Sequence, residues 1–250
     1  MALDPRKRQK QLAKQRARRK AKAAVQRRLQ QGRSSGISAF ASLEFELAAR
    51  APVYGCYVAE EIFDQGIGQV VVSHLAGGGQ VAAGIFLVDA YCLGVKDAFA
   101  FFRPRGDFED LLLRHIEQAM TLREVEPAYA KKLIVDAIAY ARDLGFGPHP
   151  DYKLASKVLQ DIDETACTTE FTFGKDGKPF FVSGPNDTEA RSKQIIDTLR
   201  RRCGPDGYHF MMALDPSGGL SLVSGGLDDD EDEWEDDDDL EDDEEDETRR

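Results

Sequence analysis

Zinc-binding and disulfide patterns are missing from this 250-residue sequence. Its cysteines are widely spaced and form no C-x-x-C pair, which excludes a disulfide framework and a zinc signature. Three of them lie in apolar or strand-like surroundings typical of ordinary buried thiols, and this indicates a reducing compartment. The cysteines are Cys56, Cys92, Cys167 and Cys203.

Long hydrophobic runs are missing as well. No stretch of 18 apolar residues occurs, and the N-terminus lacks the apolar segment that a secretion signal needs. We therefore expect a cytoplasmic protein without a membrane partner.

Acidic residues are nearly absent from the first 34 positions, which hold 13 Lys and Arg against the single acid Asp4. Residues 227 to 250 show the opposite bias, with 18 Asp and Glu against two arginines. The two ends carry net charges of +12 and −16 within a total of −12, so the middle of the chain retains only −8. This distribution predicts three segments. They are a basic helical or disordered arm at 1–36, a globular body at 37–215, and a Gly/Ser linker with a disordered acidic tail at 216–250.

The basic arm has the composition of a segment that binds nucleic acid, because it is dense in Lys and Arg and contains no aromatic residue. Residues between Pro5 and Gly32 favour a helix but offer no apolar face that could dock on the body. Such an arm contacts phosphates without reading bases, and its expected partners are RNA, DNA or a ribosome. The candidate contact residues are Arg6, Lys7, Arg8, Lys10, Lys14, Arg16, Arg18, Arg19, Lys20, Lys22, Arg27 and Arg28.

The acidic tail has no calcium-loop pattern, because no glycine follows its alternating acids in the D-x-[DN]-x-[DN]-G register. Two hypotheses remain for it. The tail either solvates the protein, or it imitates nucleic acid and competes for the basic arm or for basic protein partners.

The body is predicted to be α+β, with an antiparallel β-meander and a C-terminal hairpin or strand packed against four to five helices. Apolar runs separated by glycines predict strands at 53–63, 68–76 and 80–91. The turn KDGK predicts a hairpin within 169–184, and a final strand is expected at 208–214. Helical periodicity and capping residues predict helices at 37–50, 107–120, 127–144, 151–162 and 186–204.

Residues 86–97, FLVDAYCLGVKD, place acids inside an apolar region. In one straight strand Asp89 and Asp97 would lie about 26 Å apart, too far to share a metal. A reversal near Leu93 would set the two carboxylates opposite each other, where a divalent metal such as Mg²⁺ could hold them and support phosphodiester hydrolysis. Alternatively, a helix that begins at Gly94 would place Asp97 in its first turn.

A second candidate is the proline-rich loop GPHPDYK, which can present His149 as a general base next to Asp151. A cap on the following helix is the alternative role for Asp151.

Three functional hypotheses follow. The first is a non-enzymatic, nucleic-acid- or ribosome-associated protein without a cofactor, in which the acidic tail limits binding by the basic arm. The second is a metal-dependent nucleic-acid hydrolase, with Asp89 and Asp97 as ligands and His149 as base. The third is a chaperone-like scaffold that holds basic proteins through the acidic tail.

Overall fold

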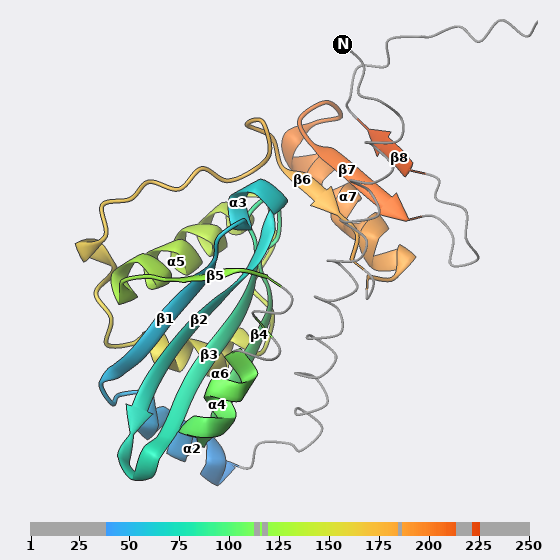
Figure 1. Ribbon diagram of the computed structural model, residues 1–250. Coiled ribbons are helices and arrows are strands. Elements are labelled where there is room, and N and C mark those ends of the chain that lie inside the picture. The colour runs from blue at the N-terminus through green and yellow to red at the C-terminus, as the bar shows by residue number, and fades with distance from the viewer. Residues whose placement is uncertain (1–38, 113–115, 117–119, 185–186, 214–221, 226–250) are drawn as a thin grey trace, which may run out of the picture.

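The computed structural model describes residues 39–112, 116, 120–184, 187–213 and 222–225 and shows an α+β protein (Figure 1). The basic arm and the acidic tail therefore lie outside the described residues. In order, the α-helices and strands are α2 (Ala39–Ala48), β1 (Val53–Ala59), α3 (Ile62–Gln65), β2 (Ile67–Ala76), β3 (Gln80–Asp89), β4 (Gly94–Pro104), α4 (Arg105–Leu111), β5 (Leu122–Glu124), α5 (Pro127–Asp143), α6 (Tyr152–Ala155), β6 (Phe180–Val182), α7 (Glu189–Cys203), β7 (His209–Ala213) and β8 (Leu222–Gly225).

Five antiparallel strands form the main sheet in the order β4-β3-β2-β1-β5. The first four follow one another along the chain, as the predicted meander requires. The short strand β5 was not predicted and pairs with the outer edge of β1. Because the meander continues into β4, residues 94–104 are a strand, and the alternative of a helix beginning at Gly94 is wrong.

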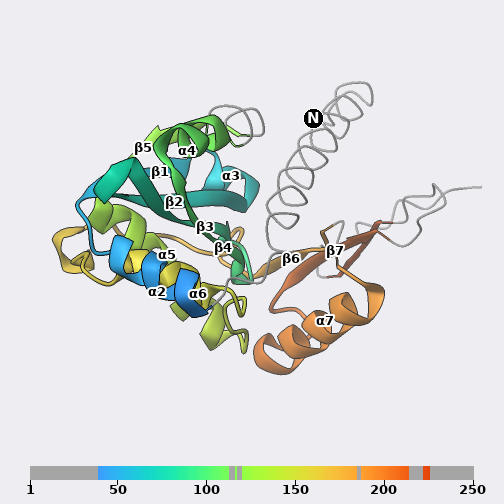
Figure 2. The ribbon, with the colours of Figure 1, turned by 90° about the horizontal axis from the view of Figure 1, so that it is seen from below.

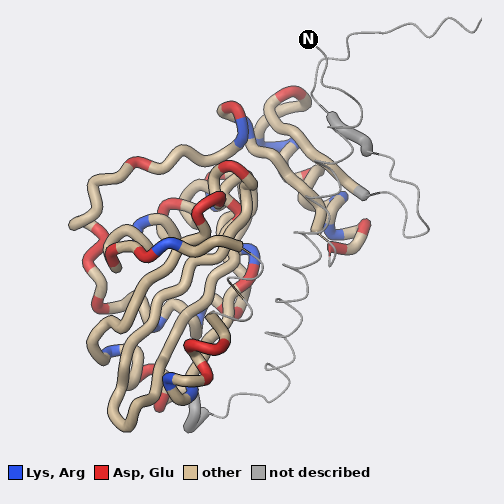
Figure 3. The backbone as a smooth tube through the Cα atoms, in the orientation of Figure 1, with Lys and Arg blue, Asp and Glu red and all other residues tan. Residues whose placement is uncertain are grey.

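The main sheet is covered on both faces, as Figure 2 shows. Helices α2, α5 and α6 lie on one face and α4 lies on the other. Alternating residues of β2 follow this division, since Val70 and Val72 belong to the core under α5 while Val71 belongs to the core under α4. A strand buried on both faces leaves little place for charge. In Figure 3 the long central strands are accordingly almost free of charged residues.

The amphipathic helix predicted at 127–144 is confirmed as α5, whose apolar face is buried. Pro127 occupies its first turn, and its inward residues are fully or almost fully buried. They are Leu133, Ile134, Ala137, Ile138 and Ala141.

The C-terminal strands form a separate three-stranded sheet with the order β6-β7-β8. The Asp-Gly turn is present, with positive φ at Asp176 and Gly177, but among the described residues of 169–184 its ladder consists of one Lys175–Lys178 bridge. Strand β6 pairs instead with β7, in parallel. A third hydrophobic cluster joins this unit to the main sheet, because Cys92 and Leu93 of the β3–β4 turn pack with residues of α7.

Candidate functional site

The chain reverses between β3 and β4, where Asp89 pairs with Gly94. Gly94 has φ of 63°, and a side chain there would meet the carbonyl oxygen of Ala137 at 2.7 Å. Glycine is therefore required both by the backbone conformation and by the close approach of α5. The reversal that the sequence analysis considered near Leu93 is thus observed.

Asp89 stabilises this reversal from inside. Its carboxylate accepts hydrogen bonds from the backbone N–H groups of Tyr91 at 3.0 Å and Cys92 at 2.9 Å, and the residue is only 6% exposed. Burial raises the pKa of Asp89 to about 6, although nearby Lys96 and the backbone N–H groups act in the opposite direction. The Asp89 carboxylate therefore serves as a hydrogen-bond acceptor for the backbone of the turn.

Asp89 and Asp97 do not face each other, because the chain reverses within residues 90–93 and pairs Asp89 with Gly94. Val88 pairs with Val95, but Leu87 pairs with Asp97, so β4 contains one extra residue at this point. The expected direct opposition of Asp89 and Asp97 is therefore wrong.

Lys96 lies in a β-bulge of β4 and forms an ion pair with Asp187, which lies two residues before α7. Its ammonium lies 2.7 Å from the carboxylate of Asp187, whose side chain is only 4% exposed. Burial alone would raise the pKa of Asp187, but Lys96 and the N–H of Gly184 outweigh it and lower the pKa. Thr188 performs the capping of α7, because its hydroxyl accepts the N–H of Arg191.

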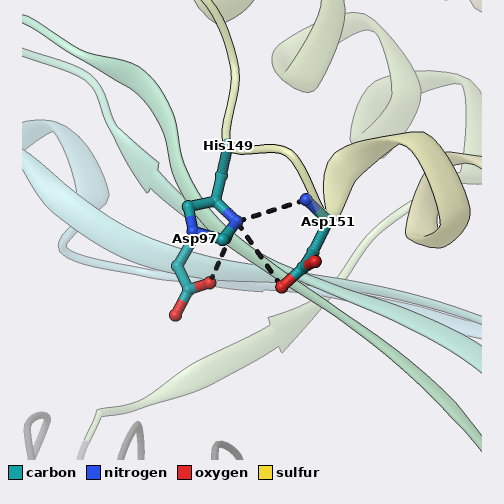
Figure 4. A group of neighbouring side chains, drawn as sticks. All are labelled: Asp97, His149 and Asp151. Atoms are coloured by element: carbon teal, nitrogen blue, oxygen red, sulfur yellow. Dashed lines mark hydrogen bonds and ion pairs between the residues drawn. The ribbon is translucent and has the colours of Figure 1, made fainter. Parts of the chain in front are cut away.

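Asp97 meets both residues of the second candidate site, as Figure 4 shows. His149 Nδ1 lies 3.6 Å from Asp97 Oδ1 and 3.6 Å from Asp151 Oδ2. One ligand atom from each residue can be chosen so that all three lie within 4.8 Å of one another. The structure thus combines half of the predicted metal pair with the predicted general base and its neighbour.

The loop that carries His149 is fixed to the edge strand. The backbone N–H of His149 donates to the carbonyl of Val95 at 3.0 Å, beside the bulge. The N–H of Ala98 donates to Asp97 Oδ1 at 2.8 Å and orients that carboxylate. The cluster of Asp97, His149 and Asp151, called the DHD cluster below, is therefore held by main-chain hydrogen bonds.

The side chain of Asp151 does not cap helix α6. Helix α6 begins directly after it, but no side-chain capping hydrogen bond forms, so the predicted capping role is wrong. The Asp151 carboxylate lies beside the imidazole instead. Sequence reasoning missed the contact of Asp97 with this loop, since the two are more than 50 positions apart and no local pattern joins them.

A groove of about 490 Å³ adjoins the DHD cluster. The loop from Gly145 to Pro150, including His149, forms one side, and Val95 and Lys96 contribute from the edge of β4. Arg191 is among the residues of α7 that line the groove.

Comparisons with protein-family models, with curated proteins and with solved structures find no match to this chain. The twelve predicted nucleic-acid contacts at 6–28 lie outside the described residues, so their placement gives no test of that prediction. Within the part of the chain that the structure describes, no helix has the length and apolar character to cross a membrane.

Proposed function

We propose that this protein binds nucleic acid through the phosphate backbone. The observation that carries the proposal is the basic arm, where 13 Lys and Arg accompany a single acid. A segment of this composition gains affinity by releasing counterions from phosphates, which makes binding strong at low salt and independent of sequence.

Helix α7 supports the proposal from the body. Its five basic side chains are all exposed, and they exceed its two acids. Three basic residues in the last turn also favour the negative end of the helix dipole, which is a structural reason for their presence. Arg191 lies in the first turn, pairs with Asp187 at 3.6 Å and lines the groove beside His149. Helix α7 thus presents exposed positive charge on a body that is otherwise net acidic.

The acidic tail is proposed to limit this binding. Its net charge of −16 is close in size to the +12 of the basic arm, so the tail competes with phosphate for the same cations. This competition is strongest at low ionic strength, where charges are least screened.

Fluorescence anisotropy with a labelled single-stranded RNA of about 30 nucleotides tests the proposal. If the basic arm makes six or more phosphate contacts, wild-type affinity for the single strand should fall by at least about 300-fold between 50 and 200 mM salt. A full-length variant with the twelve residues at 6–28 changed to glutamine should lose most of the affinity and most of the salt dependence. A second variant with the tail acids changed to Asn and Gln should bind more tightly than wild type.

Unchanged RNA binding by the glutamine variant would refute the proposal. A chaperone-like scaffold would be indicated if wild type retained basic proteins through the acidic tail and failed to bind RNA or duplex DNA. Shortening of the labelled RNA in the presence of Mg²⁺ or Mn²⁺ would indicate the hydrolase.

A further inference from the structure

The DHD cluster joins two carboxylates and one imidazole at the edge of β4. We propose that Asp97, His149 and Asp151 form a binding site for a first-row divalent transition-metal ion of the Mn²⁺ or Zn²⁺ type. This inference is independent of the nucleic-acid proposal, because it concerns the body and not the basic arm.

The separations of the ligand atoms fit a single ion. With metal–ligand bonds of about 2.1 Å, neighbouring ligands lie about 3.0 Å apart in an octahedral shell and about 3.4 Å apart in a tetrahedral one. The two distances of 3.6 Å from His149 Nδ1 to the carboxylate oxygens are close to the tetrahedral value. The third separation, between the two carboxylates, is within 4.8 Å, so side-chain rotations that draw the carboxylates together bring all three atoms onto one metal.

The backbone N–H of Asp151 points at His149 Nδ1 from 3.3 Å, the geometry in which a neutral imidazole accepts at this nitrogen and can offer its lone pair to a metal. At this distance the hydrogen bond is long, and a metal ion replaces it at little cost.

The donor set selects the class of metal. Mg²⁺ and Ca²⁺ prefer shells made of oxygen alone, whereas an imidazole nitrogen beside carboxylates suits Mn²⁺, Fe²⁺ or Zn²⁺. Two carboxylates also neutralise the charge of a divalent ion. The expected occupant thus differs from the Mg²⁺ of the hydrolase hypothesis.

The three side chains of the DHD cluster are reachable from solvent, and hydrogen bonds hold two of them in place. The side chains of Asp97, His149 and Asp151 are 13%, 28% and 47% exposed, so an ion can reach them from solvent. The Ala98 N–H on Asp97 and the hydrogen bond from the His149 N–H to Val95 hold two of the ligands in place. Three protein ligands leave further coordination positions for water or a substrate, and the groove lies next to them.

Mn²⁺ binding by the full-length protein tests the proposal, with free Mn²⁺ measured by electron paramagnetic resonance. Mn²⁺ is the probe because it has little affinity for the free cysteines. We expect one saturable Mn²⁺ per chain at micromolar concentration, above weak binding to the acidic tail. Asp97→Asn, His149→Gln and Asp151→Asn should each weaken this one site by at least about tenfold.

Asp143→Asn is the matched control, because Asp143 is an exposed acid at the end of α5 and should leave the site unchanged. Asp151→Asn is the decisive variant, since the half-exposed Asp151 makes no capping hydrogen bond and its substitution should leave the fold intact. Circular dichroism melting verifies this. Micromolar Mn²⁺ binding that persists in Asp151→Asn and Asp97→Asn would overturn the proposal, as would the loss of all saturable binding when only the tail acids are neutralised.

Discussion

Replacing Asp89 with asparagine should stabilise the protein at neutral pH, although Asp89 accepts two backbone hydrogen bonds of the β3–β4 turn. The asparagine Oδ1 can still accept the N–H groups of Tyr91 and Cys92, and Lys96 retains its ion pair with Asp187. What disappears is the cost of a buried negative charge.

The magnitude follows from the pKa. Burial raises the pKa of Asp89 from 3.8 to about 6, so the folded state binds the proton more tightly than the unfolded state does. The stabilisation from this proton is fully present below about pH 4 and is lost as the pH rises through about 6. A shift of about two pKa units corresponds to about 3 kcal/mol. Because the new amide N–H groups also need partners, Asp89→Asn should gain about 1–3 kcal/mol at pH 7.5 and close to nothing near pH 4.5.

Urea unfolding followed by far-ultraviolet circular dichroism, repeated between pH 4.5 and 7.5, measures this difference. Tryptophan fluorescence is unsuitable because the single tryptophan, Trp234, lies in the acidic tail. Protonation of the tail affects wild type and variant equally, so it cancels in the comparison. Asp143→Asn serves as the exposed control with a difference that does not change with pH. The reasoning fails if Asp89→Asn is less stable than wild type by the same amount at every pH, because the ionised carboxylate would then be the form that the turn prefers.

Two further substitutions test the same region. Gly94→Ala should destabilise the fold by about 2–4 kcal/mol in urea unfolding, since it combines a positive φ with contact at 2.7 Å to the Ala137 carbonyl, whereas Gly106→Ala, with open space around it, should have little effect. Asp187→Asn should destabilise by about 1–3 kcal/mol at pH 7, because Lys96 loses its charged partner. Because the pKa of Asp187 is lowered in the folded protein, its contribution to stability is present above about pH 4 and is lost on acidification. The stabilities of the variant and wild type should therefore converge at low pH. A difference that stays constant with pH would contradict the ion-pair explanation.

Local patterns were sufficient where secondary structure depends on periodicity. The stripe of Leu133, Ile134 and Ala137 predicts α5 because burying one helix face requires that spacing. At Gly94 the sequence left two alternatives, a reversal or a helix start, and the structure shows the reversal, because the turn needs a left-handed residue without a side chain. The α+β class follows from the same features.

Pairing between distant segments was beyond these patterns. Parallel pairing of β6 with β7 depends on how the chain between them returns, whereas the Asp-Gly turn predicts only a local hairpin. Likewise, Asp151 is a suitable capping residue by type, yet its carboxylate turns to His149 because Asp97 and the edge of β4 lie close by.

The sequence by itself determined the fold class and the charge division between the two ends, because each depends on composition or on residues near one another in the chain, whereas it left open whether the chain reverses or begins a helix at Gly94. Only the tertiary structure decided which residues gather at the candidate site. The position of the turn pairs Asp89 with Gly94 and leaves Asp97 opposite Leu87, and a main-chain hydrogen bond brings His149 to the strand edge. A one-residue change of register redirects side chains while leaving the hydrophobic pattern almost unchanged, so the partners of Asp97 follow from the assembled sheet.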